Sequence, residues 1–106
     1  MPPRFAVYRN RDLRGSSVFP MLVDVQSELL EDLNTRVVIP LARSRGFTDF
    51  PLGVVMPSIE LAGQRYVLVT PQLAAVPRTH LGPHSGSVAD QSGAISTALD
   101  VLLRGF

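Results

Sequence analysis

The segment from residue 21 to residue 42, MLVDVQSELLEDLNTRVVIPLA, constrains the fold of this chain more than any other part of the sequence. Val23 and Val25 alternate with polar residues, which is the period of a strand with one buried face. After an acidic connection, residues 36–39 form a β-branched run. We expect Pro40 to end this run because proline cannot donate to a strand ladder. The segment therefore predicts two strands joined by a charged loop.

Short strand-like runs also precede and follow this segment. Strands are expected at residues 4–8, 18–26, 36–39, 54–61 and 65–70, loops at residues 42–50 and 80–87, and a short helix or turn closed by Pro77 at residues 72–76. The Gly-containing loop at residues 62–64 lies between two strand runs and predicts a hairpin.

The last part of the chain changes to a helical period. Ile95, Ala98, Leu99 and Leu102 fall on one stripe of an amphipathic helix, and Gly105 stands where helices commonly end. Several short strands followed by one terminal helix predict a mainly β fold. We expect a small barrel or curled antiparallel sheet with the helix covering one opening.

Length and composition limit the classes of protein to which the chain can belong. With 106 residues, 45% of them hydrophobic, it is expected to form a single domain over residues 1–106. The chain has no Cys, which excludes disulfides and thiolate metal sites, and a net charge of +1 does not favour direct nucleic-acid binding. No apolar run is long enough to cross a membrane and no signal peptide is evident, so we expect a cytoplasmic protein without a membrane partner.

No residue pattern indicates a catalytic or cofactor site. His80 and His84 are four residues apart, but Gly82 and Pro83 between them exclude an ordinary helix, and we interpret both as surface histidines. None of the serines lies in a nucleophile-elbow sequence, and the absence of Lys excludes a P-loop. We favour a solvated strand face and loop over paired catalytic carboxylates for the acidic group Asp24, Glu28, Glu31 and Asp32. We therefore expect no enzymatic activity and no cofactor.

Several sequence blocks resemble the CcdB family, the toxin half of a bacterial toxin–antitoxin pair. Two of them are residues 23–30, VDVQSELL, and residues 38–42, VIPLA. The AAVP block at residues 74–77, followed by Leu81-Gly82, is also similar to a block of this family. The resemblance covers most of the chain. It implies an SH3-like barrel with a C-terminal helix, assembled as a homodimer.

The resemblance also implies a target and the surface that binds it. CcdB-like toxins bind the A subunit of DNA gyrase and trap its complex with cleaved DNA. The positions that match the family's gyrase contacts are Leu29, Leu30, Asp100, Leu103, Arg104, Gly105 and Phe106. The family has a tryptophan where this chain has Arg104, and that indole stacks on an arginine of gyrase. A guanidinium at this position replaces the cation–π attraction by like-charge repulsion.

A cognate antitoxin is the second partner that the resemblance implies. Antitoxin tails of this family are disordered and carry acidic residues, which suit bidentate pairing with arginine. Basic residues crowd the N-terminal part of the chain. The antitoxin-binding residues that we expect there are Arg9, Arg11 and Arg14.

Two other functions remain open. MazF-like endoribonucleases share the barrel and use an arginine-glycine-acidic motif near their RNA site, but here Ser16 follows Arg14-Gly15. The other alternative is a repurposed member that binds only an antitoxin or another partner. RNA cleavage would favour the endoribonuclease, gyrase-dependent DNA breaks the gyrase poison, and antitoxin binding alone the repurposed protein.

Overall fold

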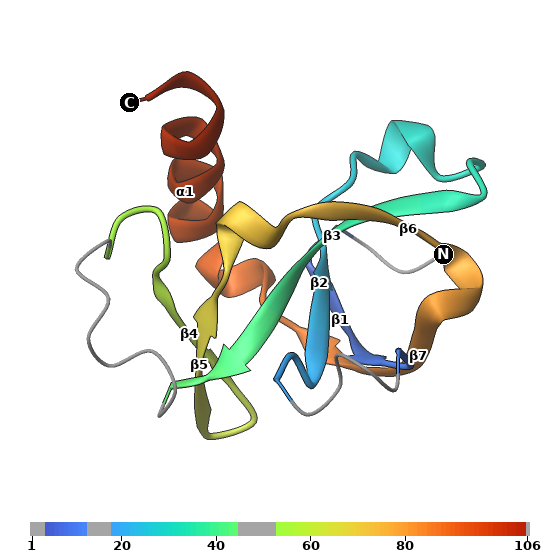
Figure 1. The fold of residues 1–106 in the computed structure, drawn as a ribbon, viewed down its shortest axis with the longest axis horizontal. Helices are drawn as coiled ribbons and strands as arrows, with labels where there is room; N and C mark the ends of the chain where they lie inside the picture. The colour runs from blue at the N-terminus through green and yellow to red at the C-terminus, as the bar shows by residue number, and fades with distance from the viewer. Residues whose placement is uncertain (1–3, 13–17, 45–52, 106) are drawn as a thin grey trace.

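The computed structural model describes residues 4–12, 18–44 and 53–105, which form a curled antiparallel sheet followed by a helix (Figure 1). The strands are β1 Ala6–Asn10, β2 Met21–Asp24, β3 Thr35–Arg43, β4 Ser58–Leu61, β5 Gln64–Leu68, β6 Ala74–Pro77 and β7 Leu81–Ser87. The helix α1 spans Ser92–Arg104, and short 3-10 turns are η1 Glu28–Leu30, η3 Thr70–Gln72, η4 Arg78–His80 and η5 Ala89–Gln91. The mainly β fold with a C-terminal helix is thus confirmed.

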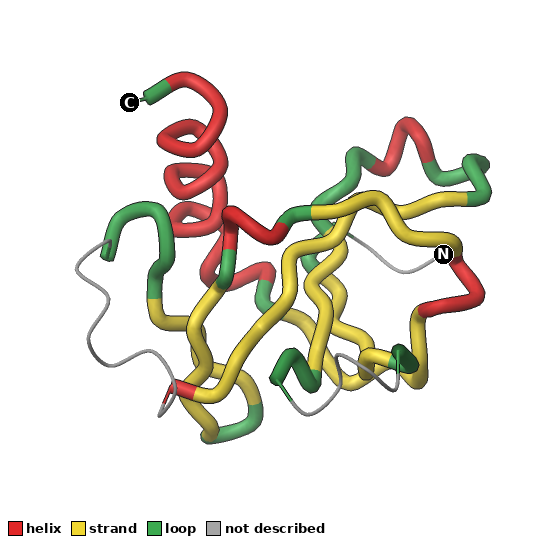
Figure 2. The backbone as a smooth tube through the Cα atoms, in the orientation of Figure 1, coloured by secondary structure: helices red, strands yellow, loops and turns green. Residues whose placement is uncertain are grey.

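The long strand β3 organises the sheet because it changes partner along one edge. The strand order is β4-β5-β3-β2-β1-β7, and β6 pairs with β3 beside this path. On one edge β3 pairs with β2. On the other edge, residues 35–38 pair with β6 and residues 41–43 with β5. The sheet therefore splits at the middle of β3 and curls into a half-barrel, which Figure 2 shows as the bent yellow tube.

Pro40 lies inside β3, so the predicted end of the strand at this residue is wrong. Its carbonyl accepts a hydrogen bond from the Val69 N–H at 2.9 Å. The N–H and C=O of a strand residue point to the same side, so the missing donor of Pro40 faces the junction between the parts of β3 that pair with β6 and with β5. The proline is tolerated because no ladder partner requires its N–H there.

One face of the sheet and α1 enclose the main core. Its buried members are Phe5, Val7, Val23, Val25, Ile39, Leu41, Ile59, Leu61, Tyr66, Leu68, Val88, Ile95 and Ala98. Alternate residues of β1, β2 and β3 supply this face, as the period of a strand requires. Ile95 and Ala98 are the buried residues of α1, and Leu99 packs against the same cluster, so the predicted helical stripe is confirmed for these three residues. Leu102, the fourth, is half-buried and lies outside the cluster.

The end of α1 has the expected cap. Gly105 has a φ of 81°, in the left-handed region that glycine adopts without a steric cost, and its N–H donates to the Val101 carbonyl at 3.0 Å. The hairpin between β4 and β5 is also confirmed. Its turn is the two-residue pair Ala62-Gly63, both at positive φ, one residue shorter than predicted.

Two segments predicted as a turn and a loop contain strands. Residues 72–76 overlap β6, and residues 80–87 include all of β7. The register of β7 along β1 shifts twice, which removes the alternating pattern that identifies a strand in sequence. Gly82 is required in β7, because a Cβ at this position would lie 2.7 Å from the Arg9 carbonyl oxygen of β1. Of the predicted loop at residues 42–50, residues 42 and 43 belong to β3, and residues 45–50 lie outside the described part.

Candidate functional site

A buried polar network joins β2 to β3. The side chains of Asp24 and Arg36 are 1% and 7% exposed, and Arg36 Nη2 lies 2.8 Å from Asp24 Oδ2. Arg36 Nε donates to the same oxygen at 2.9 Å, and Asp24 Oδ1 accepts from the Gln26 N–H at 3.0 Å. The prediction of a solvated strand face is therefore wrong for Asp24, whose carboxylate is buried and neutralised by a cation. Glu28 and Asp32 on the following loop are exposed, as predicted.

The turn that follows this network presents exposed leucines. Gln26 is buried, and its Oε1 accepts from the Val37 N–H while its Nε2 donates to the Leu30 carbonyl, each at 2.9 Å. Ser27 Oγ accepts from the Leu29 N–H at 3.2 Å and caps η1. Leu29 is 94% exposed and Leu30 49%. Two of the expected gyrase contacts thus project into solvent from a turn that polar groups hold in place.

The C-terminal end of α1 carries the other expected gyrase contacts. Asp100, Arg104 and Gly105 are exposed, and Leu103 is 71% exposed. Phe106 lies outside the described residues. Arg104 also stands in the last helical turn, where a cation complements the helix dipole.

The expected gyrase contacts form two separate groups in one protomer. Figure 1 shows η1 and the C-terminal end of α1 on opposite sides of the molecule, with parts of β3 and β6 between them. The molecule extends 36 Å along its longest axis. A single protomer therefore does not join Leu29 and Leu103 into one continuous surface.

The expected antitoxin-binding arginines lie at the end of β1. Arg9 and Arg11 are both exposed, and the Arg11 N–H donates to the His80 carbonyl of η4 at 3.3 Å. Arg14 lies outside the described residues. The structure thus places Arg9 and Arg11 on the surface, with the backbone of Arg11 beside η4.

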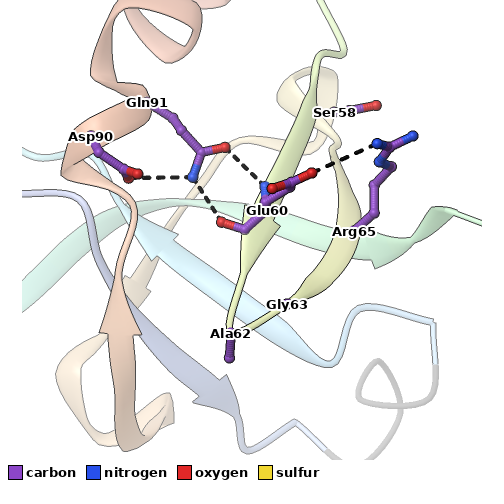
Figure 3. A pocket seen from close by; sticks show the side chains of 7 residues that line it. All are labelled: Ser58, Glu60, Ala62, Gly63, Arg65, Asp90 and Gln91. Atoms are coloured by element: carbon purple, nitrogen blue, oxygen red, sulfur yellow. Dashed lines mark hydrogen bonds and ion pairs between the residues drawn. The ribbon is translucent and has the colours of Figure 1, made fainter.

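A polar cleft lies between the β4–β5 hairpin and the start of α1 (Figure 3). The Gln91 side chain accepts from the Glu60 N–H at 2.8 Å and donates to the Glu60 carbonyl at 2.7 Å. Glu60 and Arg65 form an ion pair with 3.6 Å between nitrogen and oxygen, and their side chains are 69% and 65% exposed. An ion pair so open to water is strongly screened. The cleft thus contains two carboxylates, of Glu60 and Asp90, and the guanidinium of Arg65, all accessible to solvent.

The two histidines are exposed, as predicted. His84 lies edge-on to Tyr8, with ring centroids 5.7 Å apart. Burial raises the pKa of Tyr8 above its ordinary value of 10.0, and the negative charge of Asp24 adds to this, while Arg36 and Arg78 act in the opposite direction.

The described ranges offer neither a metal-binding cluster nor a membrane-spanning helix. Residues 4–12, 18–44 and 53–105 contain no group of three or more His, Asp or Glu side chains that could hold a metal ion. Within the same ranges, no helix is long and apolar enough to cross a membrane.

Comparison with solved structures identifies the fold of this chain. The chain is similar to a solved structure described as an endoribonuclease in complex with its cognate antitoxin from a mycobacterial species. The two share 20% sequence identity and a TM-score of 0.75, over 97% of this chain and 95% of that one. At this identity the likeness shows a shared fold.

The family is given by the sequence. The model of the CcdB protein family matches residues 4–105, so the chain belongs to the CcdB family. Membership places it among the toxins of toxin–antitoxin systems, and the resemblance seen in the sequence blocks is confirmed.

Sequence reasoning missed the Asp24–Arg36 pair and both side-chain bonds of Gln26. A signal was available, because Asp24 alternates with the buried Val23 and Val25 and therefore lies on the opposite face of the strand, and Gln26 continues this alternation just after β2. Leu22 and Val38, which share this second face of β2 and β3 with Asp24, are buried as well. Polar residues on the second face are then buried and must be paired.

Proposed function

We propose that this chain is a toxin that binds the A subunit of DNA gyrase and traps the enzyme on cleaved DNA. The observation that carries this proposal is the exposure of Leu29 and Leu103, at 94% and 71%, at positions that match the family's gyrase contacts. Covering one such side chain with a partner contributes about 1.5–3 kcal/mol. The inhibition would be stoichiometric, by protein–protein binding.

A homodimer is part of this proposal. The elements that carry Leu29 and Leu103, η1 and the end of α1, lie on opposite sides of one protomer. A two-fold assembly carries two copies of each element, so a target can reach one element of each kind from different protomers. Val101 and Leu102, in the last turns of α1, are only half-buried and are candidates for cover by the second protomer. Light scattering at micromolar concentration measures the mass directly.

Neutralisation by a cognate antitoxin completes the proposal. Exposed Arg9 and Arg11 suit the carboxylates of an acidic antitoxin segment, and the solved structure with the same fold is described as a complex with its cognate antitoxin. Arg14 is the third residue that we assign to this surface. Alanine at all three positions should weaken binding of the antitoxin and reduce its dependence on salt.

The second candidate is an endoribonuclease. It is favoured by the fold shared with a solved endoribonuclease and by the accessible polar cleft of Glu60, Arg65 and Asp90. A third candidate, a repurposed family member, binds the antitoxin alone and has neither activity.

One experiment separates the three candidates. The purified protein is incubated with gyrase, ATP and supercoiled DNA, and in parallel with total RNA. We expect gyrase-dependent DNA breaks and intact RNA. The variant Leu29→Ser should reduce the breaks, whereas the matched control Leu33→Ser, 49% exposed on the same loop but outside the contact set, should not. RNA cleavage without DNA breaks contradicts the proposal. If neither DNA breaks nor RNA cleavage is seen, the third candidate, a protein that binds only the antitoxin, is supported.

A further inference from the structure

We propose that Gln26 is the positioning residue of the partner-binding turn, holding Leu29 and Leu30 in the conformation that gyrase recognises. This inference rests on the proposed gyrase binding. It adds a residue that is buried and touches no partner. Its basis is the way in which η1 is attached to the sheet.

Apolar packing does not hold η1. None of its residues is buried, and Leu29, Leu30 and the nearby Leu33 are all exposed by at least 49%. Its own backbone bonds, Leu30 N–H to Ser27 O and Glu31 N–H to Glu28 O, close single turns that are weak in isolation. The geometry of the turn must therefore come from a connection to the rest of the molecule.

Two connections are present. The backbone N–H of Arg4 donates to Glu28 Oε1 at 3.2 Å at an exposed site, and the buried Gln26 holds the other end of η1. The Gln26 amide donates to the Leu30 carbonyl and accepts from the Val37 N–H of β3, so one side chain ties the turn to the sheet. The residue is only 6% exposed, and its own N–H is held by Asp24, which in turn is paired with Arg36. The position of the Gln26 side-chain amide is thus set by contacts outside the turn.

A turn fixed in this way binds at a lower entropic cost than one that must be ordered on contact. Ordering a loop during association reduces affinity, and pre-organisation removes that cost. Without Gln26, the Leu30 carbonyl keeps only the 3.2 Å bond from the Leu33 N–H within the loop, and this link from η1 to β3 is lost. The expected loss is about tenfold in affinity, the scale of one hydrogen bond.

The test uses the full chain and two readouts. Gln26→Met keeps the length of the side chain and removes both bonds. Its control is Ile59→Val or Ile59→Ala, whichever has the same denaturation midpoint, since Ile59 is fully buried on the distant β4. A second variant, Ser27→Ala, removes the acceptor for the Leu29 N–H at an exposed site and leaves the fold intact. Amide exchange at residues 27–33 of the free protein and binding to the gyrase A subunit are measured for each.

We expect Gln26→Met to speed exchange in the turn at least about tenfold more than in the core strands, and to weaken gyrase binding by about tenfold. Ser27→Ala should act in the same direction with smaller effects, and the Ile59 control should change neither readout selectively. Faster exchange with unchanged gyrase affinity overturns the proposal, as does unchanged exchange in the turn. If the wild-type protein does not bind gyrase, the proposed target is wrong, and the exchange data still decide whether Gln26 holds the turn.

Discussion

Two sides of the molecule present leucines to solvent in the same way but support them differently. At η1, Leu29 stands on a turn with no buried residue, held through Gln26 by a network that reaches Asp24 and Arg36. At the end of α1, Leu103 stands on a continuous helix whose earlier turns are anchored by core residues. Support is long-range at η1 and local at the end of α1. Remote substitutions should therefore disturb the η1 turn, whereas the end of α1 should respond only to changes in its own last turns.

The largest expected effect comes from the network beneath η1. Asp24→Ala leaves the Arg36 guanidinium buried without a counter-ion, which should reduce the free energy of unfolding by about 3–5 kcal/mol. The double variant Asp24→Leu with Arg36→Met removes both charges, and its free energy of unfolding should fall much less than that of Asp24→Ala. Urea unfolding measures both, with Asp32→Ala on the exposed loop as the control. Equal losses of unfolding free energy in the single and double variants would mean that an uncompensated buried charge is not the cause of the destabilisation.

The next effect concerns the end of α1 and should change binding without changing the fold. Arg104→Trp restores the residue that the family uses for stacking, and a cation–π contact can contribute the roughly 1.4 kcal/mol that corresponds to a tenfold gain in affinity. The free energy of unfolding should fall by no more than the helix-dipole contribution of Arg104, about 0.3–1 kcal/mol. Gyrase cleavage complexes are counted for both proteins, using a gyrase that keeps the stacking arginine. Stronger poisoning by the wild type than by the variant would show that the guanidinium is itself an adapted contact.

A pair of glycine substitutions should act on α1 with opposite signs. Gly105→Ala forces a side chain into a φ of 81° and should destabilise the last turn by about 1 kcal/mol. Gly93→Ala adds a Cβ that meets no atom within 4 Å and should stabilise the helix by about 0.5–1 kcal/mol. Amide exchange in α1 measures both changes. Neither substitution should alter amide exchange at η1. A change there would contradict the inference that the end of α1 is supported locally and independently of η1.

The smallest effect appears at alkaline pH. The pKa of Tyr8 is raised by burial and by Asp24, so the unfolded chain releases the phenolic proton at a lower pH than the folded protein does. Stability is therefore unaffected below pH 10 and declines as the pH rises through the unfolded value of 10.0 towards the folded pKa. Tyr8→Phe should remove this part of the decline. Unfolding midpoints at neutral pH and just above the tyrosine value test it, and the same slope in both proteins would contradict it.

The sequence predicts local features of this fold well and its long-range contacts poorly. The helical stripe of Ile95 and Ala98 and the cap at Gly105 depend on neighbouring residues, and both are confirmed. Whether Pro40 ends its strand or lies inside it depends on which parts of β3 pair with β5 and with β6, and no local sequence pattern contains this information. The burial of Asp24 likewise depends on which residues cover the second face of the sheet.

The candidate site divides in the same way. Exposure of Arg9, Arg11 and the leucine positions follows from polarity and from the family motifs, and the structure places those that it describes on the surface. The role of Gln26 depends on a partner in β3, eleven residues further along the chain. Such a pairing becomes visible only when the strands are placed side by side.

The amide of Gln91 has a consequence for the behaviour of this protein in solution. β4 is the outermost strand at one side of the sheet, and the N–H and C=O of Glu60 point away from β5, where another chain would add a strand. Gln91 occupies both groups from the same chain, as a substitute for a neighbouring strand. In a four-residue strand, this leaves little backbone for intermolecular pairing. The side chain thus protects the outer edge against aggregation, and Gln91→Ala should show as turbidity at high concentration before it shows as a loss of fold.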